Sequence, residues 1–585
     1  MLVYGDARRI EEPREKALAI RAGLERWRLP ALPIERHALV AELLIEAGEL
    51  EQGLLDARGS SLGEEQPGPL EAAASRLTRA AAALLLASFR ALGDLAGDEA
   101  AALDGALDDL LSRELLATIE VSTPEGYAFY GLYPESYLAA AESALQPDAR
   151  VIGIRSIGTG LAALVAAAVT GERSAVFSVR PQGHPFDRRL TLSAPLETAI
   201  LSGPSEFATV AIVDEGPGLS GSSFGCVADW LEDRGVAPEA IAFFPSHRGD
   251  PGPYASPRHR ERWSRARRYV AEFEDLFQSP ATRWPLASWV ADLTGDAEGP
   301  LEDLSAGRWR ERLIPDRTLW PPADLHGERR KLRLQAGGRR WLLKFAGLGR
   351  HGREKLALAR ELDGLIPPLA GLRHGFLVGP WLEEARPLPL VPDVDRRALL
   401  DAVASYLGRR ARLPAPPRQR GATPERLFEM LSHNAGKALG TDAAEALEVW
   451  RGHLPEIARR ERPVLTDNQP HAWEWLVLPD GRILKADALD HHRANDLVGP
   501  QDIAWDLAGT AVELDLDGDE RDRLAGVLAV DPLQLDFNTL AYLAFQLGRH
   551  TLAAEALASG APEEAARMRG AVETYAARLR QKIEE

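Results

Sequence analysis

One stretch, residues 210–224, constrains the fold of this chain more than any other. It reads VAIVDEGPGLSGSSF: four apolar residues, the acids Asp214 and Glu215, then a run of Gly, Pro, Leu and Ser. A short β-branched and apolar run predicts a strand buried on both faces, as in a parallel sheet. Small residues ahead of a helix let backbone N–H groups close around an anion. The stretch therefore predicts an α/β sheet with a phosphate-binding loop at the end of one strand.

The region around this stretch, from about 116 to 275, alternates strand-like and helix-like segments. Strands are predicted at ATIEVS, ARVIGI, RSAVFSVR, RLTLSAPL, ATVAIV and AIAFF, and RPQGHPFDRR (180–189) reads as a polar loop. A succession of βαβ units predicts a mostly parallel sheet with right-handed crossovers.

Three segments of this region carry a resemblance to a known family. Asp214, Glu215 and the loop after them resemble the phosphoribosyl pyrophosphate motif of type I phosphoribosyltransferases. A glycine loop after an earlier strand, and the basic loop 180–189, fall where that family binds pyrophosphate and closes over it. The resemblance implies that the acid pair holds the ribose hydroxyls as catalytic residues. It also implies that phosphates are bound by Arg155, Ser156, Gly158, Thr159, Gly160, Arg180, His184, Arg188, Leu219, Ser220, Gly221, Ser222 and Ser223.

The same stretch departs from the family in one place. Gly216, Pro217 and Gly218 replace the residues that usually follow the two acids, which leaves the acceptor of such a reaction open. An ordinary strand end and turn is the competing interpretation of the apolar–Asp–Glu–Gly pattern.

A second set of motifs begins near residue 321. Two strand-like runs, KLRLQ and RRWLLKF, flank an Ala-Gly-Gly turn and predict a hairpin. Lys344 ends the second run, and the helix-like segment after it carries Glu354. Asp467 and Asp487 follow more than 100 residues later, in RPVLTDNQPHAWEWLV and ILKADALD.

This order resembles protein-kinase-like folds, most closely the aminoglycoside and choline phosphotransferase branch. The resemblance implies that Lys344 and Glu354 pair and bind the phosphates of ATP, and that 377–383 is a hinge beside adenine. Asp467 would orient the acceptor hydroxyl as catalytic base, and Asp487 would hold Mg²⁺. The hinge contributes Trp381 and Glu383 to the expected ATP site.

The kinase-like motifs also depart from their family. Ala472 stands where a metal-binding asparagine is expected, so His471 or Glu474 would have to replace it as a metal ligand. Asp502 and Asp506 resemble the structural acids that open the next helix. The segment 490–496, DHHRAND, groups His and Asp as a metal site does, although a hydrogen-bonded loop explains it as well.

Four regions are therefore expected: a helical scaffold or hood at 1–115, a phosphoribosyltransferase-like domain at 116–275, a structured connector at 276–320 and a kinase-like domain at 321–585. The expected fold class is multidomain α/β and α+β, with a Rossmann-like parallel sheet and a C-terminal bilobal domain. Helical spacing of apolar residues in the first region and the Trp-rich composition of the connector support this division.

Composition limits the classes of function. The 585 residues carry a formal net charge of −18, which argues against a general nucleic-acid binder. Cys226 is the single cysteine, so no disulfide framework is possible and a cytoplasmic location is expected. The charged N-terminus does not resemble a signal peptide, and the longest apolar run, 80–89, is shorter than the ~20 residues of a membrane span. The sequence leaves the oligomeric state open.

These patterns predict a bifunctional enzyme that acts on small nucleotide or ribose-phosphate substrates. One domain would transfer a phosphoribosyl group at ribose C1 from phosphoribosyl pyrophosphate with Mg²⁺, and the other would phosphorylate a small-molecule hydroxyl with ATP. The alternative is a regulatory protein in which one or both folds bind nucleotide without turnover. Ala472 and the residues after Glu215 motivate that alternative.

Overall fold

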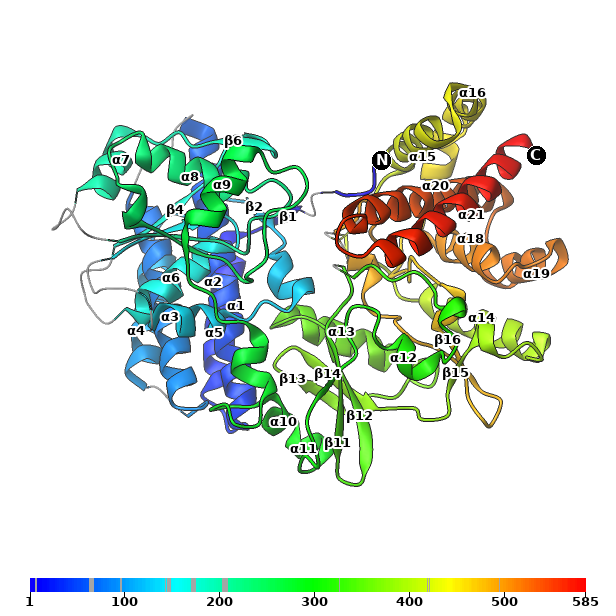
Figure 1. Ribbon diagram of the computed structural model, residues 1–585, viewed down its shortest axis with the longest axis horizontal. Helices are drawn as coiled ribbons and strands as arrows, with labels where there is room; N and C mark the ends of the chain where they lie inside the picture. The colour runs from blue at the N-terminus through cyan, green and yellow to red at the C-terminus, as the bar shows by residue number, and fades with distance from the viewer. Residues whose placement is uncertain are drawn as a thin grey trace.

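The computed structural model shows two halves lying side by side, with residues 8 to about 280 in one and most of the rest in the other (Figure 1). It describes the chain except residues 6–7, 63–67, 95–96, 143, 145–148, 170–174, 203–208, 326, 418, 420 and 494, and except the side chains of 60–62 and 493. Every structural statement below concerns the described residues.

The N-terminal region is helical, as the spacing of its apolar residues predicts. Its helices are α1 (Pro13–Trp27), α2 (Pro33–Leu62), α3 (Pro69–Arg90) and α4 (Gly97–Leu111). Proline lies at the start of the first three, where its fixed φ suits a helix and its missing N–H is not needed. Strand β1 (Arg8–Glu11) precedes them and pairs antiparallel with β2 (Ile119–Ser122). This pairing joins the segment before the helices to the segment after them.

A five-stranded parallel sheet forms the centre of the N-terminal half. Its strands are, in spatial order, β4 (Ala175–Val179), β3 (Arg150–Ile154), β7 (Val210–Val213), β8 (Ile241–Phe244) and β9 (Arg267–Arg268). Alternate residues of β7 enter two different hydrophobic clusters, because helices cover both faces of the sheet. These include α5 (Pro134–Glu142), α6 (Gly158–Ala168), α8 (Ser222–Glu232) and α9 (Pro257–Arg265). The parallel sheet predicted from 210–224 is therefore present.

Two predicted details of this region are wrong. RLTLSAPL is not a strand: its last residues begin helix α7 (Ala194–Leu201), since Pro195 fits a first helical turn and lacks the N–H that a strand needs. The loop 180–189 is not irregular either. It is a small hairpin of β5 (Gln182–His184) and β6 (Asp187–Arg189).

The C-terminal half has two lobes. The first is an antiparallel sheet in the order β10 (Glu302–Asp303), β11 (Lys331–Ala336), β12 (Arg339–Phe345), β14 (Phe376–Pro380) and β13 (Gly371–Arg373), with helix α13 (Arg350–Glu361) beside it. The predicted hairpin is β11–β12, and Gly337 and Gly338 turn it with positive φ of 56° and 74°. The connector adds α10 (Leu286–Trp289), α11 (Ala291–Thr294), α12 (Arg310–Leu313) and the edge strand β10.

The second lobe is mostly helical and lies above the sheet in Figure 1. A three-stranded sheet of β15 (Arg386–Pro387), β16 (Trp475–Val477) and β17 (Ile483–Lys485) lies next to the first lobe. The helices are α14 (Arg396–Arg410), α15 (Pro424–Leu439), α16 (Thr441–Ala446), α17 (Leu454–Arg460), α18 (Ile503–Glu513), α19 (Gly518–Leu528), α20 (Pro532–Leu557) and α21 (Pro562–Glu584). A sheet lobe followed by a helical lobe is the arrangement that the kinase-like resemblance implies.

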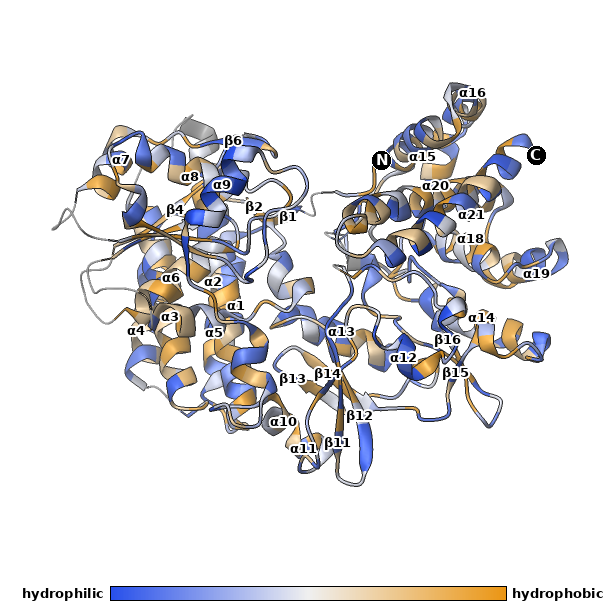
Figure 2. Cartoon of the chain, viewed as in Figure 1, coloured by the Kyte–Doolittle hydropathy of each residue, from blue (hydrophilic) through white to orange (hydrophobic). Residues whose placement is uncertain are grey.

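The two halves share one hydrophobic cluster. It combines residues of the N-terminal half, such as Leu44 of α2 and Tyr133 just before α5, with Leu343, Phe345 and Phe376 of the antiparallel sheet. Figure 2 shows hydrophobic residues concentrated on α2, α3 and α6 and polar residues on α9. Within the described residues, no helix combines the length and the apolar character that crossing a membrane requires. The shared cluster fixes the sheet lobe against the N-terminal helices.

The first residues of the chain lie in the other half. The backbone N–H of Leu2 donates to Asn434 Oδ1 at 2.8 Å, and Leu497 N–H donates to the Val3 carbonyl at 2.8 Å. Figure 1 shows the N-terminus beside α15 and α20, far from α1. The chain therefore passes between the halves at its start as well as at the connector.

Candidate active-site cleft

Candidate site residues from both halves line one cleft of about 2220 Å³. From the N-terminal half it is bordered by Asp214 and Glu215, and from the C-terminal half by Lys344, Glu474 and Asp487. The two groups were predicted independently from motifs far apart in the sequence. Their common cleft defines the candidate site.

Asp214 and Glu215 lie at the carboxyl end of β7, where the strand opens into the cleft. The backbone N–H of Glu215 donates to Asp214 Oδ1 at 2.8 Å, and that of Gly126 donates to Glu215 Oε2 at 3.2 Å. No described lysine or arginine lies within ion-pair distance of either carboxyl group. Burial raises the pKa of Asp214 to about 7; burial, together with the charges of Glu125 and Asp214, raises that of Glu215 to about 8. The pair is suited to a ligand that brings hydroxyl donors or a cation.

The small-residue loop after the pair is partly covered. Gly218 and Gly221 have positive φ of 58° and 66°, and α8 begins at Ser222. The hydroxyl groups of Ser220 and Ser222 both donate to the carbonyl of Pro185, at 3.0 and 2.6 Å. Pro185 lies at the turn of the β5–β6 hairpin, so the hairpin occupies hydroxyl donors that the resemblance assigns to a phosphate. Of the predicted loop residues, Leu219 borders the cleft directly, whereas Ser223 is not part of its wall.

The basic residues predicted for pyrophosphate are not all directed at the cleft. Arg155 and Arg180 both pair with Asp56 of α2, Arg155 at 3.3 Å and Arg180 through a hydrogen bond of 3.1 Å. This differs from the prediction, because an acid of the N-terminal helices neutralises both guanidinium groups. Arg188 does border the cleft, and His184 is exposed and accepts a hydrogen bond from the Phe186 N–H.

The predicted glycine loop 155–160 runs into the first turn of α6, where its glycines have a packing role. A Cβ at Gly158 would lie 2.5 Å from the Val213 carbonyl, and a Cβ at Gly48 would lie 3.4 Å from Gly160. These glycines therefore allow α6 to pack against β7 and α2. The Thr159 hydroxyl is buried and hydrogen-bonds Ser178 Oγ at 2.8 Å, while Ser156 remains in the cleft wall.

Lys344 joins the two lobes of the C-terminal half. Its ammonium group donates hydrogen bonds to both Asp487 and Asp490, which follow β17. The predicted partner Glu354 is not one of these acceptors. The adjacent residue of α13, Lys355, reaches Asp490 instead, at 2.6 Å. Although burial opposes ionisation, the charge of Lys344 holds the pKa of Asp487 well below its usual range.

Glu474, Asp487 and His491 form a candidate metal centre. One ligand atom from each lies within 4.8 Å of the others, and all three border the cleft. Two carboxylates suit Mg²⁺, and the imidazole nitrogen makes the set suitable for Mn²⁺ as well. His471, which was predicted as a ligand, instead bonds Glu513 through Nδ1 at 3.2 Å and stacks on Trp473.

Asp467 lies behind this group and does not form part of the cleft wall. Its carboxylate receives hydrogen bonds from Tyr406 at 2.7 Å and His491 at 3.2 Å, and Lys485 lies 3.0 Å away. Although burial opposes it, the charge of Lys485, followed by His491, holds the pKa of Asp467 well below its usual range. Its predicted role as catalytic base stays a prediction. A carboxylate behind a metal-ligating histidine orients the imidazole.

The loop that carries Asp467 is fixed by Asp506. The backbone N–H groups of Asp467 and Asn468 donate to the two oxygens of Asp506, at 2.7 and 2.9 Å. Asp502 caps α18 by accepting the Ala504 N–H at 2.9 Å. Both acids thus have the structural position that the resemblance implies.

Apolar side chains line the cleft next to Lys344. Leu342, Pro380, Trp381 and Leu476 border this part, which offers flat apolar contact to a base. Glu383 points elsewhere: it pairs with Arg340 at 2.8 Å on the exposed surface. Of the two predicted hinge residues, Trp381 alone reaches the cleft.

The sequence analysis missed several residues that the structure brings into the site. His491 and Asp490 lie in the segment 490–496, whose composition suits a metal site or a hydrogen-bonded loop but does not single out either residue. Lys485 lies between Asp467, at 3.0 Å, and Glu474, at 2.7 Å. Its position at the end of a strand, two residues before Asp487, is the sequence feature that could have indicated a role in the site. Asp56 has no local signal, because its partners lie about 100 residues further along the chain.

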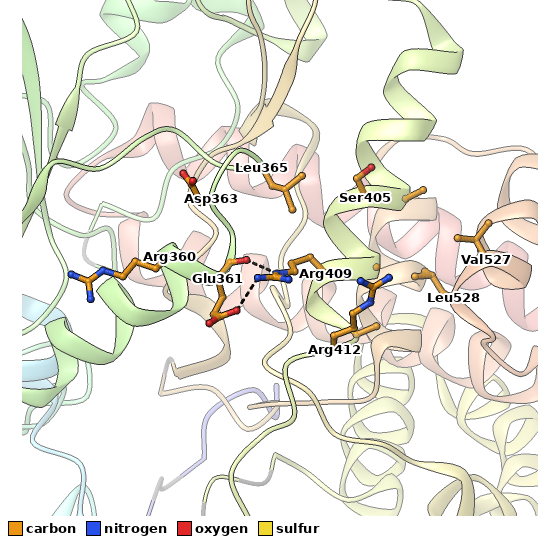
Figure 3. Close-up of a pocket in the computed structure, with 12 residues that line it drawn as sticks. Arg360, Glu361, Asp363, Leu365, Ser405, Arg409, Arg412, Val527 and Leu528 are labelled. Carbon is orange, nitrogen blue, oxygen red and sulfur yellow. Dashed lines mark hydrogen bonds and ion pairs between the residues drawn. The ribbon is translucent and has the colours of Figure 1, made fainter.

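A second, smaller pocket of about 620 Å³ lies between α13, α14 and α19 (Figure 3). Two of its charged residues pair with each other: Arg409 donates to the Glu361 carbonyl at 2.5 Å and to its carboxylate at 2.9 Å. No predicted site residue lines it. Glu361 therefore offers a control position for acid-to-amide substitutions.

Comparison with known proteins gives similarity at the level of solved structures. No family model and no curated protein matches the chain. It is similar to choline kinase LicA from Streptococcus pneumoniae (15% identity, TM-score 0.29), over 42% of this chain and 89% of that one. A choline/ethanolamine kinase family protein from Mesorhizobium loti matches with 16% identity and TM-score 0.32, over 49% and 90%. Spectinomycin phosphotransferase APH(9)-Ia matches with 11% identity and TM-score 0.33, over 50% and 96%.

Proposed function

We propose that the C-terminal half transfers the γ-phosphoryl group of ATP to a hydroxyl group of a small molecule. The observation that carries this proposal is the contact of Lys344 on β12 with Asp487 and Asp490 at the junction of the two lobes. A lysine from a sheet lobe beside acids from a helical lobe can bind nucleotide phosphates on one side and a cation on the other.

The neighbouring residues support each part of this reaction. The apolar wall around Trp381 and Leu476 suits the base of the nucleotide, and Lys344 would turn from its carboxylates to the phosphates when ATP enters. Glu474, Asp487 and His491 would hold a divalent cation. The cation would bridge phosphate oxygens and neutralise charge in the transition state. Asp467 and Lys485 would keep His491 and Glu474 in position.

Nucleotide binding and turnover test this proposal. The full chain should bind a fluorescent ATP analogue in the presence of Mg²⁺ or Mn²⁺ and should produce ADP when a suitable hydroxyl compound is present. Asp487→Asn should weaken metal-dependent nucleotide binding at least 10-fold, since it removes both a ligand charge and a partner of Lys344. Glu361→Gln is the matched control and should bind normally. Equal binding by wild type and Asp487→Asn would disprove the site.

A second candidate function concerns the N-terminal half: binding of phosphoribosyl pyrophosphate, with transfer at ribose C1. The unpaired carboxylates of Asp214 and Glu215 at the end of a parallel strand favour it, because vicinal hydroxyl groups need such acceptors. Ser220 and Ser222 would bind the 5-phosphate after the hairpin at Pro185 moves away. Calorimetric titration of the protein with phosphoribosyl pyrophosphate tests this function. Unchanged affinity in an Asp214→Asn/Glu215→Gln double variant would exclude these two acids as the binding site.

Regulatory binding of nucleotide without turnover remains the alternative for the C-terminal half. The burial of Asp467 behind Tyr406, Lys485 and His491 favours it, since this carboxylate is not part of the cleft wall. A protein of this kind would bind ATP as tightly as the enzyme but form no ADP in a single-turnover experiment. Phosphoryl transfer to any added hydroxyl compound would rule it out.

A further inference from the structure

The cleft is larger than one small-molecule site requires. Sites for single ligands usually measure about 300–1000 Å³, and this cleft measures about 2220 Å³. Asp214 and Glu215 border one part, and Lys344, Asp487 and His491 border another. Two ligands can therefore occupy it together.

A single turn of chain contacts both parts. This turn is η1 (Gly126–Tyr130) together with the residue before it. Its first N–H, from Gly126, donates to Glu215 at 3.2 Å. Asn495, four residues after His491, donates to the Tyr130 hydroxyl oxygen at 2.8 Å and to Glu125 at 3.4 Å. Thus the carboxylate pair and the loop of the metal centre lie on opposite sides of one turn.

Arginines without carboxylate partners line the same cleft. Among the described residues, Arg188, Arg260 and Arg329 border it and hydrogen-bond backbone carbonyls but pair with no acid. This is notable in a chain of net charge −18, where the neighbouring Arg330 is paired with Glu274. Unpaired guanidinium groups suit a phosphate-bearing ligand.

Arg329 lies where the two parts meet. Its Nη1 donates to the Phe129 carbonyl of η1 at 3.1 Å, and its guanidinium lies 4.8 Å from the centre of the Phe129 ring. Its Nε is buried without a hydrogen-bond partner. Its charge also acts on Asp490, the partner of Lys344. An anionic group that reached Arg329 would lie next to η1, the turn that contacts both parts of the cleft.

From these contacts we infer that the two parts of the cleft act on one molecule. A phosphorylated polyol of pentose size binds with its hydroxyl groups at Asp214 and Glu215 and its phosphate on the unpaired arginines. It is the acceptor to which the C-terminal half transfers phosphate. This inference rests on the proposed phosphotransferase function and adds the class of its acceptor.

The transfer balances with ATP as the only co-substrate. An oxygen of the bound polyol forms a bond to the γ-phosphorus, and the bond between the γ-phosphorus and the β,γ-bridging oxygen breaks. ADP leaves with that electron pair, and the hydroxyl proton passes to water in the cleft. The product carries one phosphate more than the acceptor, so the unpaired arginines also suit the product.

Ribose 5-phosphate is the probe for the test, with [γ-³²P]ATP and the full chain. Label should appear in ribose 5-phosphate at least 10-fold faster than in ribose, which lacks the phosphate, or in 2-deoxyribose 5-phosphate, which lacks one hydroxyl. The Asp214→Asn/Glu215→Gln double variant should lose at least 30-fold in this transfer and keep its affinity for a fluorescent ATP analogue within 2-fold. Arg329→Met should raise KM for ribose 5-phosphate at least 10-fold, again with nucleotide affinity unchanged, and Glu361→Gln should behave as wild type.

The outcomes separate the inference from the proposal beneath it. If wild type binds nucleotide but ribose 5-phosphate receives no label, the inference is overturned and the phosphotransferase proposal survives. Equal transfer by wild type and the double variant also overturns it, because the acceptor then binds elsewhere. If wild type binds no nucleotide, the phosphotransferase proposal itself has failed and the inference falls with it.

Discussion

Nε2 of His374 lies 3.0 Å from Oε1 of Glu135, and both side chains are buried. Glu135 belongs to α5 of the N-terminal half and His374 to the turn between β13 and β14 of the C-terminal half. His37 of α2 bonds the same carboxylate oxygen at 2.7 Å. These three residues could also hold a metal ion, but they do not border the cleft. As they stand, they bond the two halves together beneath it.

Replacing this carboxylate should weaken the junction. Glu135→Gln removes a charged acceptor of two buried hydrogen bonds and should lower the free energy of unfolding by about 3 kcal/mol. Burial alone would raise the pKa of Glu135, but His374 and then His37 hold it below its usual range. Burial lowers the pKa of His37. Both shifts make wild type lose stability on acidification: His37 below about pH 6.5, and Glu135 below about pH 4.3. Urea unfolding between pH 8 and 4 checks this. The prediction would be contradicted if Glu135→Gln had the same free energy of unfolding as wild type and the same dependence of it on pH. Glu361→Gln is the control.

The carboxylate pair should show the opposite pH dependence. Because the pKa values of Asp214 and Glu215 are raised to about 7 and about 8, the folded state keeps protons that the unfolded chain releases near pH 4. Stability contributed by these groups is full below about pH 4 and is lost as pH rises through 7 to 8. Asp214→Asn should therefore raise Tm at pH 8.5 and have little effect at pH 5. An equal Tm change at both pH values would show that Asp214 titrates normally.

Metal preference should follow His491. With an imidazole nitrogen beside two carboxylates, Mn²⁺ should support nucleotide binding at a concentration at least 5-fold lower than Mg²⁺. His491→Asn replaces the nitrogen by an amide oxygen, and the ratio should fall towards 1. His471→Asn is the matched control, since His471 bonds Glu513 instead. Metal titrations monitored by the fluorescent nucleotide would give these ratios, and a preference unchanged in His491→Asn would exclude the imidazole as a ligand.

The hairpin over the phosphate loop should limit access to it. The ring of Phe186 stacks on Tyr254 with centroids 4.7 Å apart, and this contact fixes the turn that carries Pro185. Phe186→Ala removes stacking worth about 1 kcal/mol and frees Ser220 and Ser222. Affinity for phosphoribosyl pyrophosphate, whose 5-phosphate the freed hydroxyl groups would bind, should rise about 5-fold, which calorimetry can measure. Weaker binding in this variant would mean that the hairpin contributes to the bound state.

Much of the fold could be predicted because its signals are local. The apolar run before Asp214 predicts a strand buried on both faces, and the Ala-Gly-Gly turn predicts the hairpin that carries Lys344. What could not be predicted depends on residues distant in sequence. Asp56 pairs with Arg155 and Arg180, and no local sequence pattern on α2 predicts these ion pairs. His491 and His492 both follow Asp487 closely in the sequence, and tertiary packing determines that His491 is the one grouped with it.

The position of residues 1–5 changes how the whole chain should be described. Since these residues hydrogen-bond Asn434, Asn495 and Leu497, both chain ends lie in the same half of the molecule (Figure 1). In topological terms, the N-terminal helices and the parallel sheet form an insertion within the C-terminal half. One consequence is that a proteolytic cut in the connector would yield two fragments that stay associated through the first five residues as well as through the shared hydrophobic cluster.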